Sequence, residues 1–301
     1  MWDRRTLVAA LVVAMSMPGS ALAQQQARRL FRQVPKTGER IPIVGLGTWQ
    51  AFDIGPRDSD WGQAREAVAT FLRSGGRMID SSPMYGEAES AIGTILSASA
   101  GGPKPFLATK VWTSGREAGR SQIEQSFKRM QTQTIDLLQV HNMLDFATHL
   151  ATLHDLKRRG RIRYIGATHY HPGGYDELER AIRSGALDFV QLNYSVGERD
   201  AERRLLPLAR DSRVAVIANR PFAGGELFST IRRKPLPPWA SEIGCTSWAQ
   251  LLLKYVLADS AITCAIPGTR NPRHIIDNLG AATPPLPDAR TRQRILEAAL
   301  G

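Results

Sequence analysis

Eight short apolar segments alternate along this chain with eight segments of helical periodicity. The apolar segments cover residues 44–49, 78–80, 106–112, 135–141, 162–167, 189–193, 214–218 and 262–266. The helical segments cover residues 60–74, 87–96, 121–130, 150–158, 175–183, 202–210, 247–257 and 273–279. Eight strand-helix units are the number that a closed (β/α)8 barrel needs. The sequence therefore predicts an α/β fold of the TIM-barrel type.

Length and composition indicate one barrel and no second domain. The chain has 301 residues, of which 43% are hydrophobic and 22% charged, as in ordinary globular proteins. A single barrel takes about 250 residues. Residues 30–31 and 41–43 flank the turn-rich segment 35–38 and predict an N-terminal hairpin, while residues 289–300 predict an extra C-terminal helix. Residues 226–239, rich in Pro and Arg, are expected to form a loop over the site.

The basic charge of the chain does not point to nucleic acid. The formal net charge is +11, but no nucleic-acid-binding motif accompanies it, and the arginines are scattered through helical segments. The basic run at residues 157–160 ends a predicted helix, where cations suit the helix dipole. The two cysteines, Cys245 and Cys264, match no metal or Cys-x-x-Cys spacing. We expect two buried thiols, with a disulfide between them as the alternative.

Residues 1–23 predict a targeting segment, and residues 24–301 the barrel. Arg4 and Arg5 precede an apolar core of 11 residues, 7–17, and residues 21–23 form a small-x-small cleavage site. A membrane span needs about 20 residues, so we expect cleavage before Gln24, with an uncleaved anchor as the alternative. The arginine pair resembles a twin-arginine signal, although an ordinary secretory signal would use any two positive charges. We expect a periplasmic or secreted bacterial protein that the twin-arginine machinery exports.

Polar side chains gather at the carboxyl ends of the predicted strands. Asp80 ends the second strand, Tyr85 follows five positions later, Lys110 lies near the end of the third strand and His141 ends the fourth. Active sites of (β/α)8 barrels lie at this rim. A phenol stays protonated at neutral pH and can donate a proton, and a nearby ammonium favours the phenolate that remains. Each residue alone is as well explained as a cap or a surface group, but together they predict a catalytic site.

A second candidate site precedes the last helical unit. Residues 267–270 (Pro-Gly-Thr-Arg) lead into the helix at 273–279, where free backbone N–H groups and the helix dipole favour an anion. Arg270 would add a fork of donors. The alternative is a plain turn with a solvated arginine. No Gly-x-Gly-x-x-Gly follows the first strand, so a Rossmann domain is not indicated.

The sequence resembles the aldo-keto reductase superfamily over about residues 45–278. Asp80, Tyr85, Lys110 and His141 match the catalytic tetrad of that family in order and strand context. The resemblance implies an NADP-dependent oxidoreductase, with NAD(H) as an alternative cofactor, that reduces an aldehyde or ketone to an alcohol. In that reaction Tyr85 donates the proton. Lys110, oriented by Asp80, tunes Tyr85, and His141 positions the carbonyl oxygen.

The resemblance also implies the cofactor-binding residues. These are Thr168, His169 and Gln191 for the nicotinamide carboxamide, and Gly268, Thr269, Arg270, His274 and Asn278 for the adenosine phosphate. Arg270 would favour NADPH, because a guanidinium grips the 2′-phosphate in a bidentate manner. The chain departs from the family pattern at Thr168-His169, at Gly268 and at Asn219-Arg220, and Arg220 is assigned equally to the cofactor pyrophosphate or to the surface.

Trp49, Trp112 and Phe222 are candidates for the substrate pocket, with packing as the alternative reading. The expected partner is a small carbonyl compound, and no metal site is expected. A second class of function is a nicotinamide-binding redox sensor with little turnover, and a third is a non-redox lyase or isomerase. The complete tetrad favours an enzyme over a sensor. The phosphate-binding segment and the lack of a metal cluster in the sequence argue against the lyase.

Overall fold

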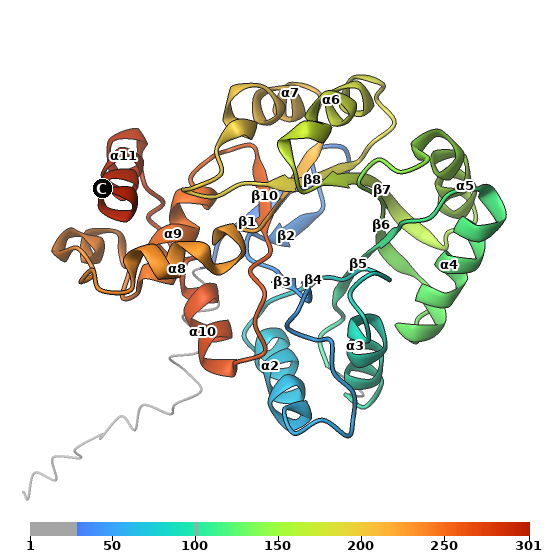
Figure 1. Ribbon diagram of the computed structural model, residues 1–301, viewed down its shortest axis with the longest axis horizontal. Coiled ribbons are helices and arrows are strands. Elements are labelled where there is room, and N and C mark those ends of the chain that lie inside the picture. The colour runs from blue at the N-terminus through green and yellow to red at the C-terminus, as the bar shows by residue number, and fades with distance from the viewer. Residues whose placement is uncertain (1–28, 100–101) are drawn as a thin grey trace, which may run out of the picture.

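The computed structural model describes residues 29–99 and 102–301. The predicted targeting segment, its cleavage point and Gln24 lie outside these residues. In the described part, an eight-stranded parallel sheet runs in chain order and curls into a barrel (Figure 1). Its strands are β3 (Leu46–Gly47), β4 (Met78–Asp80), β5 (Phe106–Val111), β6 (Ile135–His141), β7 (Ile162–His169), β8 (Phe189–Asn193), β9 (Ala215–Asn219) and β10 (Ile262–Ala265).

The first and last strands of this sheet meet and close the barrel. Val44 forms a parallel bridge with Ala265, and Gly47 forms one with Gly268. The N–H of Gly47 donates to the carbonyl of Pro267 at 3.1 Å. A Cβ atom at Gly47 would lie 2.8 Å from the backbone oxygen of Ile266, so this close approach requires glycine. The (β/α)8 barrel that the sequence predicts is thereby confirmed.

Helices surround the barrel in Figure 1. They are α2 (Trp61–Arg73), α3 (Ala88–Ser97), α4 (Arg116–Arg129), α5 (Phe146–Arg158), α6 (Tyr175–Arg183), α7 (Leu205–Asp211), α8 (Glu226–Ile231), α9 (Trp248–Leu257), α10 (Pro272–Gly280) and α11 (Ala289–Leu300). Short 3-10 turns lie at η1 (Pro172–Gly174), η2 (Asp200–Arg203), η3 (Ala223–Gly225) and η4 (Pro238–Ile243). Helix α11 is the expected extra C-terminal helix, and it contacts α8 and α9.

The expected loop at residues 226–239 is wrong in part, because α8 and the start of η4 lie within it. Leu227 and Ile231 of α8 are buried, four positions apart on one helical face. Two apolar positions are too few to predict a helix within a segment that is otherwise rich in Pro and Arg. The expectation that this segment reaches the site is met by Phe228, which lines the cavity described below.

The predicted N-terminal hairpin is present as β1 (Phe31–Gln33) and β2 (Arg40–Pro42), which pair antiparallel. The guanidinium of Arg32 donates to the backbone oxygens of Leu257 at 2.6 Å and Asp259 at 2.8 Å. Both acceptors lie just before β10. The hairpin is therefore fastened to the amino-terminal end of the strands, opposite the rim that carries the polar residues.

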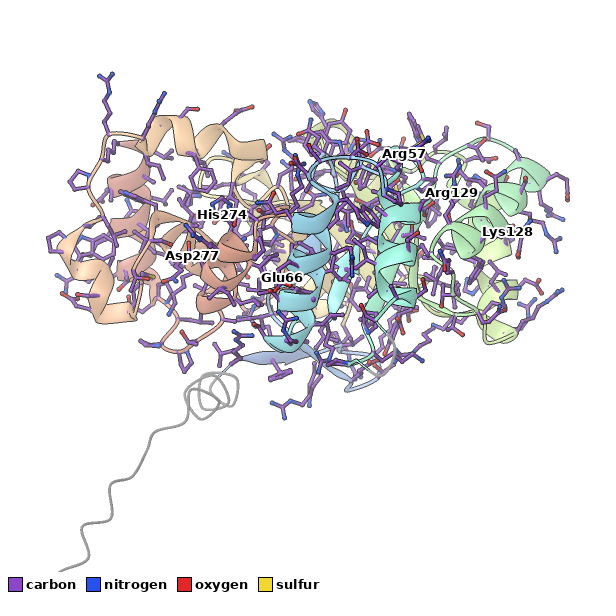
Figure 2. The ribbon with its side chains drawn as sticks, turned by 90° about the horizontal axis from the view of Figure 1, so that it is seen from below. Arg57, Glu66, Lys128, Arg129, His274 and Asp277 are labelled. Atoms are coloured by element: carbon purple, nitrogen blue, oxygen red, sulfur yellow. The ribbon has the colours of Figure 1, made fainter. Side chains whose placement is uncertain are left out.

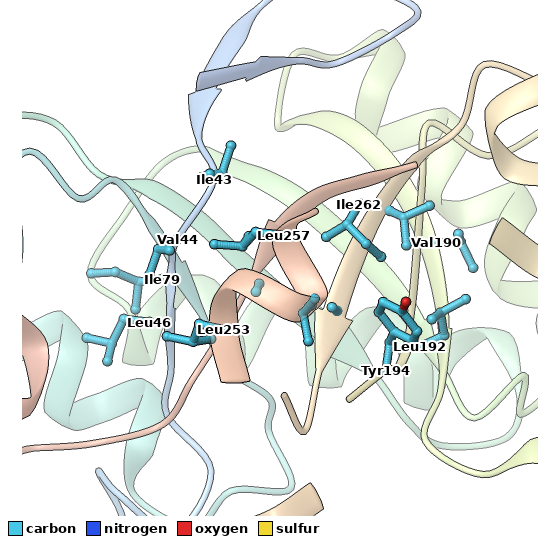
Figure 3. Packing of buried hydrophobic residues seen from close by; sticks show 14 of the residues in the cluster. Ile43, Val44, Leu46, Ile79, Val190, Leu192, Tyr194, Leu253, Leu257 and Ile262 are labelled. Atoms are coloured by element: carbon cyan, nitrogen blue, oxygen red, sulfur yellow. The ribbon is translucent and has the colours of Figure 1, made fainter. Parts of the chain in front are cut away.

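The main core lies between the barrel and its helices. Figure 3 shows Leu253 and Leu257 of α9 beside Ile79, Ile262 and other strand residues that point outward from the barrel. A second cluster fills the barrel interior with Met78, Phe106, Leu137, Tyr164, Phe189, Ile217 and Cys264. Both cysteines are buried and free, as expected. Among the described residues, no helix has the length and apolar character needed to cross a membrane.

Candidate active site

A cavity of about 610 Å³ opens at the carboxyl ends of the strands. Its floor and walls come from the last residues of the strands and from the loops that follow them. The lining includes Gly47, Thr48, Asp80, Tyr85, His141, Asn142, Thr168, Gln191, Asn219, Arg220 and Gly268. Three of the four predicted catalytic residues line it directly, and Lys110 lies buried beside Asp80.

Lys110 and Asp80 form a buried ion pair at the base of this cavity. Lys110 Nζ lies 2.7 Å from Asp80 Oδ2, and the two side chains are 0% and 2% exposed. The ammonium also donates to the backbone oxygen of Ser81 at 2.6 Å. The other carboxylate oxygen, Asp80 Oδ1, accepts from Gln139 Nε2 at 3.1 Å and from Gln191 Nε2 at 2.9 Å. Asp80 on β4 is thus linked to side chains of β5, β6 and β8.

These contacts keep Lys110 charged. Burial lowers the pKa of Lys110, because it penalises the ammonium, but Asp80 and Tyr85 outweigh this effect and the pKa is raised overall. A buried ion pair contributes little net stability by itself, whereas the loss of one partner leaves an uncompensated charge. The pair is therefore best explained by the effect of the ammonium on Tyr85, where burial raises the pKa and the ammonium offsets part of that rise.

Tyr85 lies in the turn between β4 and α3, above the ammonium. Lys110 Nζ is 5.0 Å from the centre of the Tyr85 ring. Burial raises the pKa of Tyr85, and the charge and hydrogen bond of Lys110 offset only part of this rise. The phenol is thus protonated at neutral pH. Gly86 follows with a φ of 57°, and a Cβ there would lie 2.0 Å from the carboxylate of Asp53, so glycine is required in this turn.

His141 completes the group from the end of β6. Its ring centre lies 6.2 Å from that of Tyr85, edge to face, and 6.0 Å from that of Trp112. His141 Nδ1 lies 3.3 Å from Ser82 Oγ. Burial, together with the positive charge of Lys110 and with His169, lowers the pKa of His141 to about 3. The imidazole is therefore neutral at physiological pH, so one ring nitrogen donates a hydrogen bond and the other accepts one.

The predicted cofactor-binding residues lie in three places. Thr168, Gln191, Arg220 and Gly268 line the cavity. His169 does not line it: its Nδ1 lies 2.8 Å from the backbone oxygen of His171 and its ring fills the space beside Gly174. The remaining four residues, Thr269, Arg270, His274 and Asn278, lie at or just before α10, beyond the cavity lining.

The N-terminus of α10 has the features of an anion site. Asn271 caps the helix by accepting from the N–H of Arg273 at 2.9 Å, and Pro272 occupies its first turn. Thr269 Oγ1 lies 3.4 Å from His274 Nδ1. Arg270 Nη2 lies 2.6 Å from the carboxylate of Asp60. Arg270 is therefore already paired with an acidic side chain.

Asn142 and Asn219 line the cavity and were missed as candidates from the sequence. The Oδ1 atom of each is buried and lacks a hydrogen-bond partner among the described residues. Asn142 also has a φ of 52°, and such strained conformations cluster at functional sites. Their positions at strand ends could have identified them, since Asn142 follows His141 and Asn219 ends β9. Two unsatisfied acceptors in one cavity suit a ligand that carries N–H donors.

Gln139 was also missed, and strand alternation could have found it. It stands two positions before His141 on β6, so both side chains point to the barrel interior. The candidate substrate residues Trp49, Trp112 and Phe222 all line the cavity. Met84, Tyr170 and Phe228 join them there. The mouth of the cavity is consequently largely apolar.

The sequence matches the Aldo/keto reductase family over residues 43–294. It is 28% identical over 246 residues to methylglyoxal reductase YeaE of Escherichia coli, with 79% of this chain and 84% of the relative covered. It is 26% identical to an NADH-specific methylglyoxal reductase of E. coli, with coverage of 82% and 91%. The match to aldo-keto reductase YhdN of Bacillus subtilis, at 27% identity, covers 62% of this chain and 60% of that protein.

Solved structures share the fold. An aldo-keto reductase from Klebsiella pneumoniae in complex with NADPH superposes with a TM-score of 0.73 at 22% identity, covering 87% of this chain and 92% of that chain. The fold is that of a (β/α)8 barrel, and the family match places the chain among the oxidoreductases. The chain belongs to the aldo/keto reductase family. The relatives named above are enzymes, and these comparisons give no support to a sensor without turnover.

Proposed function

We propose that this protein reduces the carbonyl group of an aldehyde or ketone to an alcohol, with a reduced nicotinamide cofactor and with Tyr85 as the proton donor. One observation carries the proposal: the buried ion pair of Lys110 and Asp80 holds an ammonium 5.0 Å from the Tyr85 ring, at the base of a cavity. A phenol beside a fixed positive charge can release a proton to a developing alkoxide.

A bound nicotinamide would supply the hydride to the carbonyl carbon. Tyr85 would donate its proton to the carbonyl oxygen. The phenolate that remains is stabilised by the ammonium of Lys110, which Asp80 holds in place. His141 stays neutral and offers a ring N–H to the same carbonyl oxygen. The chain thus orients the carbonyl and delivers the proton from one side of the cavity.

The residues present fit a nicotinamide cofactor. The carboxamide group carries N–H donors, for which Asn142 Oδ1 and Asn219 Oδ1 are unsatisfied acceptors in the described part of the chain. Thr168 and Gln191 would hold the same group, with Arg220 on the pyrophosphate. Gly268, Thr269, Arg270, His274 and Asn278 would hold the adenosine phosphate at the N-terminus of α10. One relative is named NADH-specific and one similar structure contains NADPH, so both cofactors are candidates.

The apolar mouth of the cavity favours a carbonyl compound with an apolar substituent. Trp49, Trp112 and Phe228 are 46%, 37% and 40% exposed, although such large apolar side chains are normally covered. Phe222 packs against Phe228 with ring centres 4.8 Å apart. An alkyl or aryl group that covers these side chains would gain about 25 cal/mol for each Å² removed from water.

Cofactor binding and turnover can be tested separately. Purified protein is titrated with NADPH and NADH while protein fluorescence is followed, and an aldehyde such as benzaldehyde is then added while cofactor absorbance at 340 nm is recorded. We expect binding first and oxidation of the cofactor only after the aldehyde is added. Binding without oxidation across a panel of aldehydes, ketones and sugars would favour the sensor, and no binding of either cofactor would refute the proposal.

A further inference from the structure

We propose that Asp60 sets the cofactor preference of this protein by holding Arg270, and that it shifts this preference away from NADPH and toward NADH. The inference rests on the proposed function, because it assumes that the adenosine end of a nicotinamide cofactor binds at Arg270. The sequence alone predicts that Arg270 favours NADPH. The contact with Asp60 changes that expectation.

The guanidinium of Arg270 already makes one hydrogen bond from each of its two terminal nitrogens. Its Nη2 donates to Asp60 Oδ2 at 2.6 Å, and its Nη1 donates to the backbone oxygen of Ala51 at 3.3 Å. A bidentate grip on a phosphate uses two such parallel N–H groups. A 2′-phosphate at Arg270 would therefore share the guanidinium with the negatively charged Asp60, or displace it.

Asp60 is directed at Arg270 rather than at its own helix. It occupies the N-cap position of α2, where an aspartate normally accepts from a backbone N–H of the first turn. Its side chain makes no such bond. Helix α2 packs against α10, and Figure 2 shows Glu66 of α2 beside the helix that carries His274 and Asp277. The packing of these two helices brings the carboxylate to the arginine.

The two cofactors differ at the atom that this pair would meet. NADPH carries a phosphate with close to two negative charges there, and NADH carries a neutral hydroxyl. The carboxylate of Asp60 repels the phosphate, but it can accept a hydrogen bond from the hydroxyl. Asp60 and Arg270 are 45% and 33% exposed, so water screens the pair. The effect is consequently a graded preference and not an exclusion.

The test is the replacement Asp60→Asn, with dissociation constants for both cofactors measured by fluorescence titration. We expect NADPH to bind about 5- to 10-fold more tightly and NADH to change by less than about twofold. Glu66→Gln is the matched control, because it removes one negative charge from α2 at an exposed ion pair with Arg73. The control should leave the ratio of the two dissociation constants within about twofold of the wild type.

A second replacement links the effect to Arg270. In an Arg270→Ala background, Asp60→Asn should improve NADPH over NADH by clearly less than it does with Arg270 present, because only the direct repulsion of the phosphate is then relieved. The inference is overturned if Asp60→Asn changes both cofactors equally, or if it weakens NADPH, which would make Asp60 a residue that orients Arg270 for phosphate. If the wild type binds neither cofactor, the proposed function fails and this inference fails with it. Thermal melting of each variant checks that the fold is kept.

Discussion

The ammonium of Lys110 lies 2.7 Å from the carboxylate of Asp80 and 5.0 Å from the ring centre of Tyr85. The lysine side chain is fully buried and Asp80 is 2% exposed, where it lines the cavity. The charge that acts on Tyr85 is therefore only weakly screened by solvent and is fixed in position. This arrangement lets a group with a high pKa serve as an acid, because the positive charge stabilises its conjugate base.

Tyr85→Phe should lower kcat/KM for carbonyl reduction by about 10²- to 10⁴-fold, the range that a proton donor contributes. The ring and its packing remain, so the dissociation constant for the cofactor should stay within about twofold of the wild type. Steady-state kinetics and fluorescence titration measure the two quantities. Retention of most of the turnover would show that another group donates the proton.

Asp80→Asn should lower both stability and turnover. The amide oxygen can still accept from Gln139 and Gln191, but Lys110 loses its counter-charge in a buried site. Breaking a buried pair in this way costs about 3–5 kcal/mol, which urea unfolding would measure. Asp211→Asn is the control, since Asp211 is 71% exposed beside Arg210 and its replacement should change stability by less than about 0.5 kcal/mol.

His141 should make the protein less stable as the pH falls from about 6.5 toward 3. Its folded-state pKa is about 3, below the ordinary value of 6.5, so the unfolded chain binds more protons between these limits. Stability therefore rises with pH across this window. Melting temperatures from pH 4 to 7 should show a smaller slope for His141→Gln than for the wild type. An equal slope would mean that His141 is not held neutral.

The apolar mouth should matter for bulky substrates. Phe228→Ala should lower kcat/KM for hexanal by about tenfold, because about 1.5 kcal/mol of apolar contact is lost, and for methylglyoxal by less than about threefold. Phe31→Ala provides a control, since Phe31 is 41% exposed on the hairpin at the opposite end of the barrel. Equal losses for both aldehydes would exclude a role in substrate selection.

Export by the twin-arginine route stays a prediction from the sequence. Replacement of Arg4 and Arg5 by Lys keeps the positive charge of the segment but removes the arginine pair. Fractionation of cells that express the double variant should find the protein in the cytoplasm, whereas the unchanged sequence should reach the periplasm and begin at Gln24. Export of the double variant at the normal rate would indicate an ordinary secretory signal.

The sequence predicts the fold and the cavity residues where the information is local. The positions of Asp80 and His141 in the site can be predicted because each residue ends a buried strand, and strand ends meet at one rim. Helix α8 was hidden because its short apolar face, Leu227 and Ile231, lies within a Pro-rich and Arg-rich segment. The contact of Asp60 with Arg270 joins positions 210 apart, and it depends on how two helices pack. No local pattern records such a pairing.

The links from Asp80 to three other strands have a consequence for how a protein of this kind could change over time. Replacing Asp80 removes the counter-charge of Lys110 and hydrogen bonds to side chains of three other strands, whereas loss of the Tyr85 hydroxyl breaks none of these bonds. In a descendant that lost catalytic activity but still bound its cofactor, a single replacement would then be sufficient. The replaced residue would be Tyr85, and the ion pair of Lys110 and Asp80 would be retained for its structural role alone.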